Sequence, residues 1–174
     1  NRKDDRRYRV VDVFLFHGSA GVSITHNDFY EASTPLYVTS GYSGSSILFQ
    51  HNHVDGGDDW RCDGPTDGDF IVTDNVFENV KLWLFSGCAP SLTNNDLLGP
   101  NNPRLVLQGF NGDGLDPPIL DATDNYWGEE ATAQMEALGA DANIAAIEDY
   151  YDDFTLGKVD YSGWLSEPVA GAGP

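Results

Sequence analysis

A repeat of about 23 residues constrains the fold of this chain more than any other feature of its sequence. Five segments share the order apolar, any, apolar, polar, polar, Asn, any, apolar, and their asparagines are 25, 23, 20 and 30 residues apart. These asparagines are Asn27, Asn52, Asn75, Asn95 and Asn125. A second register consists of glycines that are 23, 23, 23 and 22 residues apart, each closing a short strand-like run: Gly18, Gly41, Gly64, Gly87 and Gly109. Two registers with similar mean periods predict a solenoid.

The content of each repeat narrows the class of solenoid. A repeat holds two or more short strands and no helix between them. Leucine-rich repeats would show an LxxLxL signature, which is absent, and ankyrin and tetratricopeptide repeats are longer and helical. A parallel β-helix remains, in which each coil stacks on the next at about 4.8 Å. We therefore predict an all-β solenoid of about five coils over residues 1–128.

The repeated asparagines have a structural role in such a stack. Asn tolerates the left-handed backbone region at a sharp turn, and stacked Asn side chains pass amide hydrogen bonds from coil to coil. We predict that the five asparagines form an internal ladder and not a ligand site. The polar row two residues before them is predicted to face water: Thr25, Gln50, Thr73, Thr93 and Thr123.

Alternation in the strand before each glycine leaves two choices for its inward face. The residues three and five positions before the glycine include Asp59, Arg61 and Arg104, and burying an unpaired charge costs several kcal/mol. The residues two and four positions before it carry no charge, so we predict that they form the core. They are Phe14, Phe16, Tyr37, Thr39, Trp60, Cys62, Trp83, Phe85, Leu105 and Leu107.

One row of this set is aromatic and recurs every 23 residues: Phe14, Tyr37, Trp60 and Trp83. The charge argument favours an internal stack. On the outside the row would be a platform for sugar rings, with Tyr37, Trp60 and Trp83 as glycan-binding residues. With the row inside, the opposite set forms an exposed apolar patch that needs a cover or a partner. The patch comprises Val13, Leu15, Leu36, Val38, Leu82, Leu84 and Val106.

The repeats stop after Gly128, and residues 129–174 are predicted to cap the solenoid within the same domain. Residues 129–138 have helical composition and end at Gly139, and Asp141 is placed to cap a second short helix over residues 142–151. An extended tail over residues 158–165 follows. We expect this segment to lie on the apolar patch or to close one end of the solenoid. A homodimer interface over the patch is the competing explanation.

The charge of the chain limits its partners. Its 174 residues include 28 Asp and Glu but 9 Lys and Arg, which gives a net charge of −19. Such a surface repels phosphate backbones, which argues against nucleic acid, and it repels anionic polysaccharides unless a cation bridges. No apolar run is long enough to span a bilayer, which argues against membrane insertion. Cys62 and Cys88 are the only cysteines, and they can pair in an oxidising compartment or stay free.

Three motifs carry a family resemblance: the [ILV]-x-x-x-Asn-x-[FVL] repeats, Asp124-Asn-Tyr-Trp-Gly128, and the closing run from Ile147 to Leu165. With these motifs the chain resembles the right-handed parallel β-helix proteins of the pectate-lyase-like superfamily, which are extracellular repeat proteins. The resemblance implies a right-handed β-helix, an extracellular or cell-surface location, and a role as a module of a larger parent protein.

The superfamily includes calcium-dependent polysaccharide lyases, in which an Arg or Lys base acts beside carboxylates that hold Ca²⁺. The resemblance implies Arg61 or Arg104 as the catalytic base. A hard cation takes about six to eight oxygen ligands and acidifies the proton to be removed. The candidate ligands are Asp55, Asp58, Asp59 and Asp63. Surface ion pairs are the simpler interpretation of these charges, and we favour it.

The sequence therefore predicts a non-catalytic extracellular β-helix module, structural or glycan-associated, with a polysaccharide as partner. The alternative is a Ca²⁺-dependent polysaccharide lyase or a related carbohydrate-active enzyme. The residues leave open whether the protein is an enzyme and whether it takes Ca²⁺ as a cofactor.

Overall fold

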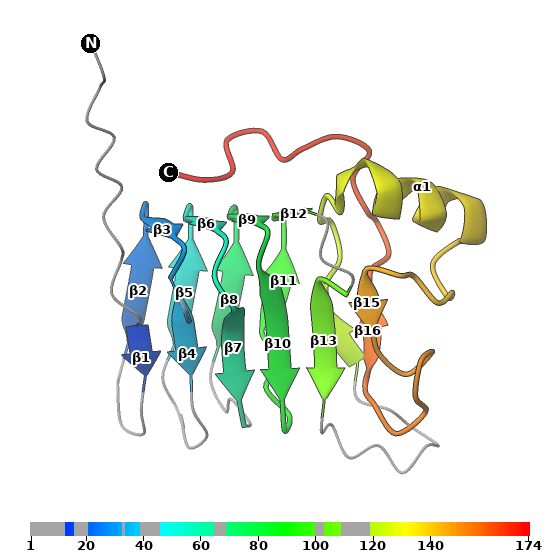
Figure 1. The fold of residues 1–174 in the computed structure, drawn as a ribbon, viewed down its shortest axis with the longest axis horizontal. Coiled ribbons are helices and arrows are strands. Elements are labelled where there is room, and N and C mark those ends of the chain that lie inside the picture. The colour runs from blue at the N-terminus through cyan, green and yellow to red at the C-terminus, as the bar shows by residue number, and fades with distance from the viewer. Residues whose placement is uncertain are drawn as a thin grey trace.

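The computed structural model describes residues 13–15, 21–32, 34–38, 46–64, 69–99, 103–108 and 119–174. In these residues the chain is a parallel β-solenoid with one C-terminal helix (Figure 1). Three parallel sheets run along the solenoid, and the strands within each sheet come from successive repeats. The backbone groups of one turn therefore pair with those of the turns on either side, as the repeat pattern predicts.

The largest sheet, sheet A, has six strands. They are β1 (Val13–Leu15), β4 (Leu36–Val38), β7 (Asp59–Asp63), β10 (Lys81–Phe85), β13 (Leu105–Gln108) and β15 (Ile147–Glu148). Sheet B has four strands: β2 (Val22–Thr25), β5 (Ile47–Gln50), β8 (Phe70–Thr73) and β11 (Ser91–Thr93). Sheet C also has four: β3 (Asp28–Tyr30), β6 (His53–Asp55), β9 (Val76–Glu78) and β12 (Asp96–Leu98).

The described strands make about three turns, so the five coils predicted from the repeats are not all shown. The fifth repeated segment differs from the other four. Its strand β14 (Ile119–Asp121) pairs with β16 (Lys158–Asp160) in a separate two-stranded sheet instead of extending sheet B. The chain after the helix thus supplies the partner that a further turn would otherwise supply.

The asparagine ladder is confirmed. Each Asn donates its Nδ2 to the Oδ1 of the next, at 3.0, 3.1, 2.9 and 3.1 Å from Asn27 to Asn125. The same Oδ1 atoms also accept the backbone N–H of the preceding Asn. The side chains of Asn52, Asn75, Asn95 and Asn125 are fully buried, so the ladder satisfies polar groups inside the solenoid. The polar row two residues before them is half-buried at the surface.

The left-handed backbone at this turn belongs to the residue before each ladder asparagine, and not to the asparagine itself. These residues are His26, His51, Asp74, Asn94 and Asp124, with φ between 50° and 58°. The predicted assignment to the asparagine is therefore wrong; the residue before it is also polar, so residue type does not separate the two positions. The ladder Asn lies after the bend, where its side chain can point inward along the stack.

The predicted inward face of sheet A is correct in two strands and wrong in two others. Trp60, Cys62, Leu105 and Leu107 are buried as expected, but Tyr37, Trp83 and Phe85 point outward and are half-buried. Most residues of the expected exposed apolar patch belong to the core instead: Leu15, Leu36, Val38, Leu82 and Leu84. Val13, another residue of that patch, is partly buried and packs against the core. Val106 lies on the outward side but is buried. The side chain of Phe14, together with Phe16 and Thr39, lies outside the described residues.

The error comes from the glycines, which are not equivalent between turns. Asp63 pairs with Phe85, so the position of Gly64 corresponds to Ser86 and not to Gly87. Gly64 and Ser86 both have positive φ, at 94° and 51°. In consequence, β7 is shifted by one residue from the register that counting back from each glycine predicts. A shift of one residue exchanges the inward and outward faces of a strand.

The interior is aromatic, but its members differ from those expected. The Trp60 ring centroid lies 5.7 Å from that of Phe49, 5.8 Å from Phe70 and 6.0 Å from Phe77. Phe29, Phe49 and Phe77 form a column along sheets B and C, with centroids 5.9 and 6.1 Å apart. The solenoid is therefore held by a packed aromatic core beside the amide ladder.

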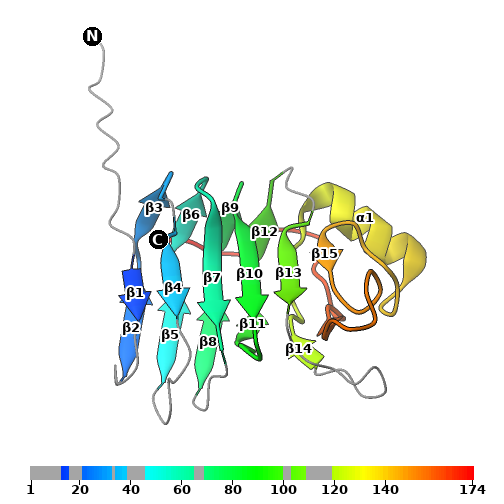
Figure 2. The ribbon, with the colours of Figure 1, turned by 60° about the horizontal axis from the view of Figure 1, so that its bottom comes forward.

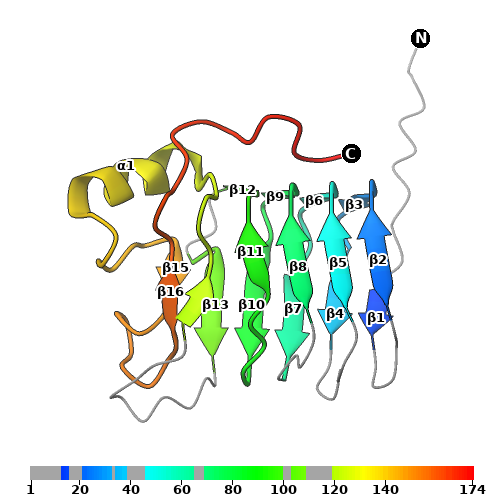
Figure 3. The same ribbon diagram turned by 180° about the vertical axis from the view of Figure 1, so that it is seen from behind.

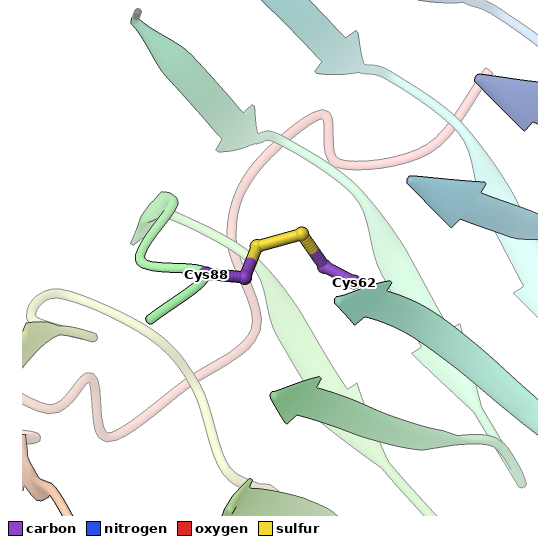
Figure 4. Close-up of a disulfide and its surroundings, with 2 residues drawn as sticks. All are labelled: Cys62 and Cys88. Carbon is purple, nitrogen blue, oxygen red and sulfur yellow. A yellow bond between two sulfur atoms is a disulfide. The ribbon is translucent and has the colours of Figure 1, made fainter. Parts of the chain in front are cut away.

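Cys62 and Cys88 form a disulfide, with their Cα atoms 5.9 Å apart (Figure 4). Cys62 is on the inward side of β7, and Cys88 follows β10. Sequence analysis left the pair open. The bond links two neighbouring turns from the inside, since both cysteines are fully buried.

The C-terminal segment closes one end of the solenoid (Figure 2). Helix α1 (Gly128–Leu138) confirms the helix predicted over residues 129–138. The second predicted helix is wrong: this stretch contains β15, which extends sheet A, and turns. Asp141 caps no helix and binds Lys158 instead, which holds the pKa of Asp141 below its usual range. The extended tail predicted over residues 158–165 is confirmed only in its first part, because β16 ends at Asp160 and a turn follows.

The last residues run back along the solenoid beside sheet C (Figure 3). Leu165 N donates to Asn125 O at 2.9 Å, Val169 N to Asp96 Oδ1 at 2.8 Å, and Gly173 N to Asp74 O at 2.9 Å. These last residues therefore lie on the sheet C side of the solenoid and not over sheet A. Within the described part of the chain, no helix has the length and apolar character needed to cross a bilayer.

Candidate functional site

The outward side of sheet A carries one row of side chains in register across five strands. Tyr37 pairs with Arg61, Arg61 with Trp83, Trp83 with Val106, and Val106 with Glu148. We call Tyr37, Arg61, Trp83, Val106 and Glu148 the outer row. Because paired residues on parallel strands stand side by side at about 4.8 Å, the row follows the solenoid axis.

Arg61 lies between aromatic rings. Its Cζ is 5.4 Å from the ring centroid of Tyr37, 5.1 Å from that of Trp83 and 4.6 Å from that of Phe85. The rings of Trp83 and Phe85 are 4.5 Å apart and tilted by 34°. We call Tyr37, Arg61, Trp83 and Phe85 the aromatic platform. The guanidinium fills the gap between Tyr37 and Trp83, so the stack continues without a break, and each contact is a cation–π interaction.

A hydrogen bond and a second cation fix the indole of Trp83. Its Nε1 donates to Gln108 Oε1 at 3.1 Å, and Lys81 Nζ is 5.5 Å from its ring centroid. A Trp whose N–H is satisfied by a neighbour presents a rigid ring to solvent. The half-buried platform rings are thus held in place but retain exposed surface.

Charges surround the aromatic platform on β7 and β10. Asp59 pairs in register with Lys81 on the outward side of the sheet. Partial burial raises the pKa of the Asp59 carboxyl, and Asp58 acts in the same direction, while Lys81 and Arg61 oppose the shift. The platform therefore combines aromatic faces with nearby hydrogen-bonding groups of both signs.

A groove of about 440 Å³ continues the platform at the C-terminal end of the sheet. Its lining comes from β13 and the residue shortly before it, from β15, and from the chain on either side of β15: Pro103, Gln108, Ala145, Ile147, Glu148, Asp152, Asp153 and Leu156. Gln108 belongs to both features, because it bonds Trp83 and lines the groove. The two features therefore meet at Gln108.

Of the three candidate glycan-binding residues, the structure places Tyr37 and Trp83 on the aromatic platform and Trp60 in the core, where it is 1% exposed. Trp60 cannot contact a ligand on this surface. The next residue on the same strand, Arg61, faces outward instead and takes the central position of the stack.

The two candidate bases lie in different environments. Arg61 is on the platform. Arg104 is buried, and its guanidinium donates to the carbonyl oxygens of Gly99 at 2.9 Å, Leu97 at 3.1 Å and Trp127. Burial lowers the pKa of Arg104, which is the direction a base needs, while Glu130 and Tyr126 oppose the shift. Its N–H groups nevertheless bind backbone, so Arg104 ties the turn after β12 to the start of α1.

The four candidate calcium ligands are spread over two sheets. Asp55 lies in sheet C, where its Oδ1 accepts from Asn79 Nδ2 at 3.1 Å. Asp58 is exposed in the turn before β7, and Asp59 and Asp63 stand at opposite ends of that strand. In the described ranges no three His, Cys, Asp or Glu side chains come together in a way that would hold a metal ion.

Sequence analysis missed Gln108 and Glu148, and it placed Phe85 inside. The strand register decides the position of Phe85 and Gln108, and a one-residue correction at β7 would have revealed them. Glu148 carries no such signal, because β15 joins sheet A only after the helix has closed the end of the solenoid.

The chain matches no protein-family model, and searches of the curated proteins and of the solved structures found no significant match.

Proposed function

We propose that the protein is a non-catalytic glycan-binding module, and that the aromatic platform with its groove is the binding surface. The observation that carries the proposal is the outward stack of Tyr37, Arg61 and Trp83. Sugar rings have an apolar face that packs on aromatic rings, and hydroxyl groups that bond to amides and charged side chains at the edges. Gln108, Lys81 and Asp59 lie at those edges.

The dimensions also suit an extended sugar chain. Tyr37 and Trp83 are two strands apart, which corresponds to about 10 Å along the solenoid. This spacing resembles the length of two units of an extended β-linked polysaccharide. Because Arg61 fills the space between the rings, one sugar chain could lie on all three side chains.

We further propose that the module is extracellular and belongs to a right-handed, five-coil β-helix of the pectate-lyase-like kind. The disulfide supports an oxidising compartment, since such bonds persist outside the cytosol. The parallel stacking and the ladder support the likeness of fold. The alternative of a Ca²⁺-dependent lyase draws less support, because Arg61 is engaged by three rings and Arg104 by three carbonyls.

Affinity electrophoresis in gels that contain hydroxyethyl cellulose, glycol chitin, xylan or polygalacturonate tests the proposal. We expect retardation in at least one neutral gel, lost in Trp83→Ala and weakened in Tyr37→Ala. Ile71→Ala is the matched control, because Ile71 is exposed on sheet B, away from the platform. Equal retardation of the control and of Trp83→Ala would contradict the proposal, as would the absence of retardation in every gel.

A further inference from the structure

The groove and the aromatic platform are joined by the strand register. Trp83 pairs with Val106 and Val106 with Glu148, so the backbones at Trp83 and Glu148 are two strand spacings, or about 10 Å, apart. A short oligosaccharide that lies along the outer row would therefore reach from the indole into the groove. The groove lining includes two apolar residues, Ile147 and Leu156, and the polar Gln108.

The polar groups of the groove are not equally occupied. Gln108 uses its Oε1 for Trp83, which leaves its amide nitrogen as a donor. Asp152 accepts from Asn143 Nδ2 at 3.2 Å and from Asp149 N at 3.2 Å. Asp153 accepts from Thr155 N at 2.9 Å and Oγ1 at 2.8 Å, and these bonds hold the pKa of Asp153 below its usual value.

Glu148 differs from these two aspartates. Among the residues that the structure describes, no hydrogen bond or ion pair reaches its carboxylate. It is half-buried, stands in the outer row and lines the groove. Its acceptor capacity is therefore available to a ligand, whereas that of its neighbours is partly used to shape the loop after β15.

The lining carboxylates decide which sugar fits. A uronate or sulfated unit would bring a second anion against Glu148, Asp152 and Asp153 in a partly desolvated groove. An ammonium group would find the opposite sign. Arg61 is three strands from Glu148, about 14 Å away, which exceeds the screening length of about 8 Å at physiological salt. The cation of the platform therefore does not oppose a positive group in the groove.

We propose that the groove is a subsite for an amino sugar, in which Glu148 accepts the ammonium group of a glucosamine-type unit while the adjoining units stack on Trp83. This inference rests on the proposed function and specifies its ligand. It makes the module selective for a cationic glycan over a neutral one and excludes polyuronates.

Calorimetric titrations with glucosamine tetramer, cellotetraose and galacturonate tetramer test it, at mildly acidic pH where the amine is protonated. We expect the glucosamine tetramer to bind about tenfold more tightly than cellotetraose, as for one charge-assisted hydrogen bond, and the galacturonate tetramer not to bind. Glu148→Gln should remove most of this preference and leave the affinity for cellotetraose within about twofold. Glu167→Gln is the control, because it changes the net charge equally in the exposed C-terminal tail.

The outcomes separate the two proposals. If the sugars bind and Trp83→Ala abolishes binding, but cellotetraose equals glucosamine tetramer, the glycan module stands and the amino-sugar subsite is wrong. If Glu148→Gln and Glu167→Gln weaken glucosamine binding equally, the preference reflects net charge and the subsite is also wrong. If no tetramer binds the wild-type chain, the amino-sugar subsite is wrong. The glycan module is contradicted as well only if none of the polysaccharide gels retards the wild-type chain.

Discussion

Two tryptophans on neighbouring strands of sheet A have opposite environments. Trp60 and Trp83 each stand four residues before a glycine. Trp60 is 1% exposed and packs against phenylalanine rings in the core, whereas Trp83 faces outward beside Arg61 and Gln108. Distance from a turn residue therefore does not decide the face of a strand. The hydrogen-bond register with the neighbouring turn does, and a single residue in one connection reverses it.

Truncating each tryptophan in turn tests most directly whether the two faces of sheet A differ in this way. Trp60→Ala removes the centre of the aromatic core, and we expect it to cost about 3–5 kcal/mol of unfolding free energy. Trp83→Ala removes a half-buried ring, and we expect about 1 kcal/mol or less. Urea denaturation followed by circular dichroism measures both values. Equal costs would show that the two faces are not distinguished as described.

The asparagine ladder also has two environments, a buried interior and an exposed end. Asn75 is fully buried and bonds to Asn52, Asn95 and two backbone carbonyls, whereas Asn27 is exposed. Asn75→Ala leaves several buried groups unpaired, and we expect a loss of about 3 kcal/mol against about 1 kcal/mol for Asn27→Ala. The midpoints of urea unfolding compare them. A larger loss of unfolding free energy in Asn27→Ala than in Asn75→Ala would contradict the placement of Asn75 in the buried interior of the ladder and of Asn27 at its exposed end.

The disulfide tests how far the inner face depends on covalent linkage. It closes a sequence separation of 26 residues, for which the loss of chain entropy in the unfolded state corresponds to about 3.5 kcal/mol. We expect the double variant Cys62→Ala, Cys88→Ala to lose about that amount and to keep its glycan affinity. Thermal denaturation of the oxidised wild type and of the variant measures the first, and affinity gels the second. Loss of binding in a folded variant would mean that the outer row depends on this link.

Replacing Arg61 tests the surface role of the outer face and is expected to change the unfolding free energy least. Its three cation–π contacts favour the folded state, but its Nε is buried and finds no hydrogen-bond partner among the residues that the structure describes. The two effects partly cancel, so we expect Arg61→Leu to change the unfolding free energy by about 1 kcal/mol or less. Glycan affinity should fall several-fold in the same variant. A loss comparable to that of Trp60→Ala would place Arg61 in the structural core and contradict a surface role.

The candidate site was predictable in part. Tyr37 and Trp83 are visible in the sequence as members of a recurring aromatic row, and the alternative of an outward platform follows from them. The inward face predicted from the burial of charge was correct only in part. The inward face of β7 was predicted correctly, because Arg61 must face water. The same face was wrong for β4 and β10, because the prediction assumed that equivalent residues of successive turns lie at equal distances from a glycine. Ser86, and not Gly87, holds the backbone position of Gly64, which residue type alone does not reveal.

The parallel stack, the ladder and the first helix were determined by the sequence alone, because each depends on a local pattern repeated at a nearly constant period. Asn is the residue that can pass hydrogen bonds along such a stack, so its recurrence specifies an axis. The register between turns, the pairing of β14 with β16 and the position of Glu148 beside Val106 were decided by the tertiary structure. They depend on which distant backbone groups remain available for pairing, and that competition is settled only when the whole chain is packed.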